Sequence, residues 1–148
     1  MNKRNGLLAG CLGLGMILMG CDSSTGTSGT TVSEAALIGK WSITSVHTKG
    51  WETDNLGNKK DVDSTETFPV GVNTVEYKSD HSYSTGMGGL NLGGTWSVKG
   101  DSVITVTSFL GLEIPSSVSA SISGNSGTFI SHQVDTEEDL VVTTTATK

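Results

Sequence analysis

The feature that most constrains the fold is a succession of short segments in which apolar and polar residues alternate, from residue 39 onward. In residues 39–46, Trp41 and Ile43 alternate with polar side chains. Because successive side chains of a β-strand point to opposite faces of a sheet, Trp41 and Ile43 are predicted to enter a core. Residues 94–98 repeat the same Gly-x-Trp-Ser-aliphatic pattern, so Trp96 is predicted to point inward in the same way.

Further strands are predicted from the same alternation and from the turn residues between them. They cover residues 65–70, 72–78, 81–85, 93–99, 102–108, 109–114, 117–123, 128–134 and 140–147. About eight or nine strands at spacings of about 8–12 residues, without a helical period, favour an all-β antiparallel barrel, with a β-sandwich as the alternative. A barrel of about eight strands is either filled by its own side chains or holds one small ligand.

Two segments are predicted to be loops. Residues 50–63 are polar and contain the turn signal Asp-Asn-Leu-Gly-Asn at 54–58. Residues 86–93 are rich in glycine and longer than a hairpin turn requires. A lid over the mouth of a barrel is one hypothesis for residues 86–93, and a simple β-hairpin is the interpretation that we favour.

The amino-terminal residues 1–20 are predicted to be a signal peptide. A short head with Lys3 and Arg4 precedes an apolar stretch, residues 6–20, which is too short for a membrane span of about 20 residues. Its end, Leu-Met-Gly-Cys, resembles the lipobox of bacterial lipoproteins. That resemblance implies cleavage before Cys21 and a diacylglycerol on the Cys21 thiol; the alternative is an ordinary signal peptide with a chance cysteine.

A Ser/Thr/Gly-rich tether is expected at residues 21–36, followed by one barrel domain at residues 37–148. One helical turn capped by Ser33 is expected just before that barrel. Cleavage would remove Lys3 and Arg4 and change the net charge from −6 to −8. This charge argues against nucleic acids and anionic lipid surfaces as partners. The expected location is the cell envelope, lipid-anchored, with the membrane and its leaflet left open.

Three stretches, residues 37–46, 75–84 and 94–101, together resemble the small lipocalin-like domains of bacterial lipoproteins. Those domains begin Leu-x-Gly-x-Trp, turn at Asp-Gly into a strand with tyrosine, and continue Gly-x-Trp-x-aliphatic-x-Gly-Asp. The resemblance implies an up-and-down β-barrel in which Trp41 closes one end. This chain differs at His81, which stands where a glycine usually follows the aspartate.

Four aromatic residues are the candidates for lining a ligand pocket, and core packing is the favoured alternative for them. They are Trp41, Tyr77, Tyr83 and Trp96. Small residues predicted to face inward and to leave room for a ligand include Ser121, Thr143 and Thr145.

Metal and catalytic chemistry find little support in the sequence. Asp61, Asp63 and Glu66 form an acidic cluster of the kind that calcium prefers, but they lack the EF-hand spacing, and a solvated loop is favoured. The three histidines are not spaced as zinc ligands, and no Gly-x-Ser-x-Gly motif is present. We therefore expect no metal, no cofactor and no enzymatic activity.

The predicted function is that of a membrane-anchored lipocalin-like lipoprotein that binds a small apolar or amphipathic molecule in the barrel. The alternative is a protein-interaction or inhibitor module of the cell envelope. In that alternative the barrel is solid, and residues 48–63 and 86–94 form the contact surface.

Overall fold

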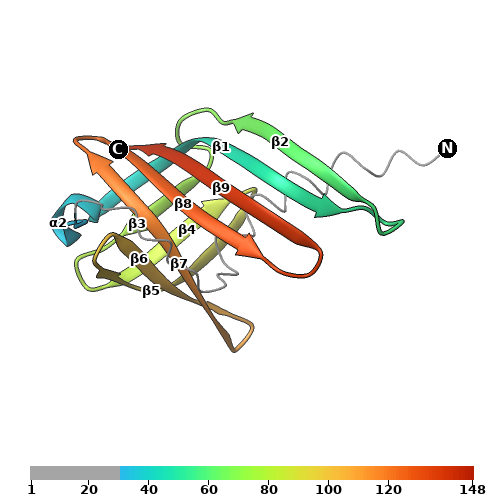
Figure 1. The fold of residues 1–148 in the computed structure, drawn as a ribbon. Helices are drawn as coiled ribbons and strands as arrows, with labels where there is room; N and C mark the ends of the chain where they lie inside the picture. The colour runs from blue at the N-terminus through green and yellow to red at the C-terminus, as the bar shows by residue number, and fades with distance from the viewer. Residues whose placement is uncertain (1–30) are drawn as a thin grey trace.

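The structure, a computed structural model, describes residues 31–148 and forms a β-barrel (Figure 1). One short helix, α2 (Glu34–Leu37), precedes nine strands. The strands are β1 (Gly39–Thr53), β2 (Lys59–Thr67), β3 (Thr74–Tyr77), β4 (Ser82–Met87), β5 (Leu90–Lys99), β6 (Ser102–Phe109), β7 (Leu112–Ser123), β8 (Ser126–Val134) and β9 (Glu138–Thr147).

The barrel closes because β1 pairs with β9 as well as with its neighbours in sequence. The strand order is β2-β1-β3-β4-β5-β6-β7-β8-β9, and every pairing is antiparallel. Eight strands, β1 and β3 to β9, make the closed wall, and β2 is an extra strand on β1. The prediction of an antiparallel barrel of about eight strands is therefore confirmed.

Strand β1 pairs with two different strands along the same edge. Its first residues, from Gly39 to Ser42, pair with β3, whereas Ser45 to Thr53 pair with β2. The register against β9 shifts between Ile43 and Ser45, where β1 has a bulge. A bulge adds one residue and so changes which side chains point inward. Trp41 and Ile43 are buried before it, and Val46 is the next buried residue after it.

Both segments predicted to be loops form β-hairpins instead. Residues 50–63 contain the end of β1, a turn in which Asp54 Oδ1 accepts hydrogen bonds from the Leu56 and Asn58 amides, and the start of β2. Residues 86–93 belong to β4 and β5, joined by a turn at Gly88 and Gly89 with φ of 58° and 85°. The hairpin interpretation of residues 86–93 is therefore confirmed.

The two strands predicted at 109–114 and 117–123 are one strand, β7, while Phe109 ends β6. Pro115 is tolerated inside β7 because this half of the strand pairs only with β6. Pairing with β8 begins at Ser119. The missing N–H of a proline costs little where a strand has a free edge.

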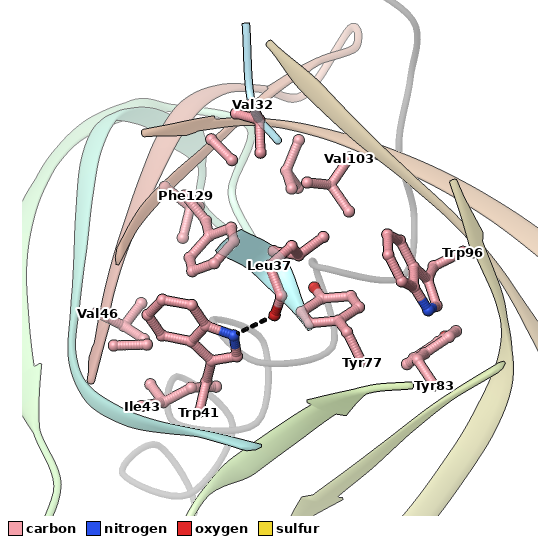
Figure 2. Packing of buried hydrophobic residues seen from close by; sticks show 14 of the residues in the cluster. Val32, Leu37, Trp41, Ile43, Val46, Tyr77, Tyr83, Trp96, Val103 and Phe129 are labelled. Atoms are coloured by element: carbon pink, nitrogen blue, oxygen red, sulfur yellow. Dashed lines mark hydrogen bonds between the residues drawn. The ribbon is translucent and has the colours of Figure 1, made fainter. Parts of the chain in front are cut away.

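One end of the barrel is covered by α2 and the residue that leads into it. Leu37 is completely buried, and its carbonyl oxygen accepts a hydrogen bond of 2.7 Å from Trp41 Nε1 (Figure 2). The Val32 amide donates to the Gly100 carbonyl at 3.0 Å, and the Val32 side chain joins the core. The packed domain therefore includes Val32, ahead of the expected start at Leu37. Ser33 is the residue before α2, but its side chain makes no capping hydrogen bond.

Lys148 also stabilises this end of the barrel through contacts with α2 and the start of β1. Its Nζ donates to the carbonyl oxygens of Ala36 and Ile38 at 2.7 and 2.8 Å and lies 4.7 Å from the centre of the Trp41 ring. In Figure 1 the carboxyl terminus and α2 lie at the same end of the barrel. The opposite end carries the β1–β2, β2–β3, β4–β5, β6–β7 and β8–β9 connections.

The predicted signal peptide, Cys21 and most of the tether predicted at 21–36 lie outside the described residues. Within residues 31–148, no helix is long and apolar enough to cross a membrane.

Candidate functional site

A cavity lies inside the barrel, beyond the layer formed by α2 and Trp41. Its volume is about 40 Å³. This volume limits what the closed barrel can hold. The lining is mainly apolar and comes from strands all round the barrel: Ile43, Val75, Tyr77, Tyr83, Thr85, Met87, Thr105, Val118, Phe129, Ser131, Thr144 and Ala146.

The four aromatic residues predicted as pocket candidates divide into two pairs. Tyr77 and Tyr83 line the cavity, whereas Trp41 and Trp96 do not. Trp41 meets Phe129 edge-on, with ring centres 6.1 Å apart. Trp96 meets Tyr77 in the same way at 5.5 Å, and its Nε1 donates to the Lys78 carbonyl oxygen. Both tryptophans are therefore core residues near the α2 end, as Figure 2 shows for Trp41, Leu37 and Tyr77.

The two tyrosines that line the cavity are described by a hydrogen bond of Tyr83 and a shifted pKa of Tyr77. The Tyr83 and Thr107 hydroxyls are hydrogen-bonded to each other, and Thr107 is completely buried. Burial raises the pKa of the Tyr77 phenol above its ordinary range, with a smaller contribution from the nearby Tyr83. Tyr77 is therefore neutral at physiological pH, and the cavity lining contains no carboxylate, ammonium, guanidinium or imidazole group.

Four hydroxyl-bearing residues interrupt the apolar lining. Thr85, Thr105, Ser131 and Thr144 come from β4, β6, β8 and β9 and are 4–8% exposed. Within the described part of the chain, none of their hydroxyls makes a hydrogen bond, and none is an enclosed oxygen without a partner. Each of these oxygens therefore faces open space.

The small inward residues predicted from the sequence were assigned to the wrong face. Ser121 is exposed, and Thr143 and Thr145 are only half-buried. Their neighbours Ala120, Thr144 and Ala146 are the buried residues, because alternation along β7 and β9 places every second side chain inside. In β9, Leu140 and Val142 mark the inward face, and continuing that period to Thr144 would have found it.

Exposed apolar side chains gather at the end of the barrel opposite α2. They lie on the β2–β3, β4–β5 and β6–β7 connections and the adjoining strand ends, and we call them the apolar rim: Val70, Val72, Leu90, Phe109, Leu110 and Leu112. Leu110 is 87% exposed. Met87, half-buried at the end of β4 next to this rim, also lines the cavity. The cavity therefore extends from the barrel interior toward the apolar rim.

The acidic cluster predicted as a weak metal candidate does not converge. Asp63 Oδ1 accepts a hydrogen bond of 2.9 Å from His47 Nε2, and Asp63 Oδ2 lies 3.9 Å from Lys49 Nζ. Glu66 is on the opposite face of β2 from Asp61 and Asp63, because its position differs from theirs by an odd number. Within residues 31–148, no three His, Cys, Asp or Glu side chains are placed to hold a metal ion.

Comparison of this chain with protein-family models, with curated proteins and with solved structures finds no match. The class of the protein follows from its own architecture. It is a closed eight-stranded antiparallel β-barrel with one extra strand, an arrangement consistent with a lipocalin-like barrel.

Proposed function

We propose that this protein binds a small apolar or amphipathic molecule inside the barrel, with the rest of a longer ligand extending toward the apolar rim. The observation that supports this proposal is the mainly apolar cavity next to Met87. Ligand sites in proteins typically have volumes of about 300–1,000 Å³. Because the space for water-sized groups is only about 40 Å³, the closed barrel suits a slender group, such as one end of a chain.

Extraction of the purified full chain with organic solvent, followed by mass spectrometry, tests this proposal. A Thr144→Leu variant fills the cavity, and Thr143→Leu makes the same change one residue away, on the other face of β9. We expect a co-purifying molecule in the wild type and in Thr143→Leu, and its loss in Thr144→Leu. Equal amounts in all three proteins would place the molecule elsewhere.

We further propose that Cys21 anchors the protein to a bacterial membrane through lipid. The support is the lipobox-like sequence Leu-Met-Gly-Cys at residues 18–21. Two or three acyl chains give firm attachment where one gives only marginal binding. Labelling cells with an alkyne fatty acid tests this: the label should be present in Cys11→Ser and absent from Cys21→Ser. A labelled Cys21→Ser protein would contradict the proposal.

A protein-interaction role is the second candidate, and the apolar rim favours it. Contiguous exposed apolar groups often mark interaction sites. Crosslinking in the native envelope, repeated after replacing Leu110 and Leu112 with serine, should lose a specific partner if this role is correct. If the same crosslinks persist in that variant, the rim is not the contact surface.

A further inference from the structure

The inner wall of the barrel combines apolar surface with unsatisfied hydroxyl groups. Thr85, Thr105, Ser131 and Thr144 are each more than nine-tenths buried and line the cavity. Their hydroxyls make no hydrogen bond within the described residues and face open space. A hydroxyl group that lines an apolar cavity offers a donor and an acceptor, so a guest that hydrogen-bonds to it gains more here than in a purely apolar cavity.

No charged group faces this space. The ionisable residues among the lining are the tyrosines Tyr77 and Tyr83, and the Tyr83 hydroxyl is bonded to Thr107. The Lys148 ammonium group lies at the α2 end, bonded to backbone carbonyl oxygens, and is not part of the lining. A carboxylate or ammonium ion that entered the cavity would lose its water without meeting an opposite charge, which is costly.

We propose that this cavity selects neutral molecules that carry a terminal hydrogen-bonding group, such as an alcohol or a primary amide, and excludes carboxylates and ammonium ions. This inference rests on the proposed ligand-binding function and specifies the chemical class of the ligand. The polar end of the ligand enters among the four hydroxyls, and its apolar part lies against Val75 and Met87.

Methionine supplies a local probe for the test. The chain has four methionines, and Met87 alone lies beyond residue 19. Labelling the methionine methyl groups with carbon-13 therefore gives one NMR signal from the cavity wall. The full chain, held in phosphatidylcholine nanodiscs, is titrated with xenon, butan-1-ol, butanamide and butanoate. Signals from Met1, Met16 and Met19, where present, report nonspecific partitioning of a probe.

Butanamide and butanoate are close in shape and differ in charge. We expect butanamide and butan-1-ol to shift the Met87 signal, with butanoate at least about tenfold weaker at neutral pH. Equal affinity for butanamide and butanoate would overturn the inference.

Substitution of the hydroxyls provides the second comparison. Thr105→Val and Thr144→Val keep the side-chain shape and remove one hydroxyl each. Each should weaken butan-1-ol binding about 2- to 10-fold and leave xenon binding equal or stronger. Thr143→Val, on the other face of β9, is the matched control and should leave both affinities unchanged. Unchanged butan-1-ol binding in Thr105→Val and Thr144→Val would also overturn the inference.

The probes separate this inference from the function on which it rests. If xenon and all the organic probes leave the Met87 signal unmoved, the cavity is not accessible and the ligand-binding function itself fails. If xenon shifts the signal but neutral and charged probes bind alike, only the selectivity fails. The comparison of butanamide with butanoate uses the wild-type chain. It therefore tests the selectivity even if a valine variant does not fold.

Discussion

The indole Nε1 of Trp41 donates a hydrogen bond of 2.7 Å to the carbonyl oxygen of Leu37, and both residues are completely buried. This bond joins the first barrel strand to α2, which covers the barrel end. Trp41 thereby satisfies its own polar atom and a carbonyl of a short helix in one contact. The Trp41 ring also packs edge-on against Phe129 of β8. Trp41 therefore connects α2 with β1 and β8, the two strands that pair with β9.

Replacing Trp41 with alanine should lower the free energy of unfolding by about 3–5 kcal/mol, because it leaves a large cavity in the core. Urea unfolding followed by circular dichroism measures this loss. Trp51→Ala is the matched control, since Trp51 is only half-buried, with its ring 3.7 Å from Lys59 Nζ. A loss below about 1 kcal/mol for Trp41→Ala would contradict its place in the core.

The contributions of the Tyr83 and Thr107 hydroxyls to the free energy of unfolding should be strongly coupled. Thr107→Val leaves the Tyr83 hydroxyl without its partner and should cost about 1–3 kcal/mol. Adding Tyr83→Phe removes the second hydroxyl as well, so the double variant should lose less than the sum of the two single variants. Urea unfolding of all four proteins completes this double-mutant cycle. Simple additivity would show that the two hydroxyls do not interact.

Alkaline pH should destabilise the barrel through Tyr77. Burial raises its pKa in the folded state, whereas the unfolded chain ionises near the ordinary value of about 10. The unfolded state therefore loses its proton first, and stability that is fully present below pH 10 declines above it, by up to about 1.4 kcal/mol per pH unit. Unfolding measured from pH 9 to about 11.5 should show a smaller decline in Tyr77→Phe. Identical declines in the two proteins would refute a raised Tyr77 pKa.

Substitutions of the turn residue His81 should separate two opposing effects on the free energy of unfolding. Its φ of 63° is a left-handed conformation that costs a side-chain-bearing residue about 1 kcal/mol. Its ring lies 5.2 Å from that of Trp96, and its Nε2 lies 3.4 Å from Glu34 Oε2. His81→Ala loses these contacts and keeps the strain, whereas His81→Gly relieves the strain. We expect the alanine variant to be less stable than the glycine variant by about 1 kcal/mol in urea unfolding. The reverse order would contradict this assignment of strain.

Local sequence signals predicted much of the barrel. Alternation identified the inward phase of Trp41 and Trp96, and both are buried. The His81 backbone takes a left-handed conformation, which glycine adopts more easily, and the tight β3–β4 turn forms with histidine at this position. These features depend on neighbouring residues, which is why the sequence reveals them.

The predictions that failed depend on partners far away in the chain. Residues 50–52 form a strand because they pair with β2 and β9 at once, and their own sequence does not indicate this. Separate strands were predicted at residues 109–114 and 117–123, but only the sheet shows that Pro115 lies within β7, on a half of the strand that has β6 as its single strand partner. The cavity lining shows the same division: it includes Tyr77 and Tyr83 from among the four predicted aromatic candidates, and hydroxyl-bearing residues that the sequence did not indicate, Thr85, Thr105, Ser131 and Thr144.

The sequence by itself determined most of the strands and turns and the inward direction of Trp41 and Trp96, because alternation and turn chemistry act over a few residues. Only the tertiary structure decided which strands close the barrel, that α2 covers its end, and that an apolar cavity with four free hydroxyls remains inside. A cavity is space left between side chains from different strands. Its size and polarity depend on how the barrel closes, and no single segment of the chain carries that information.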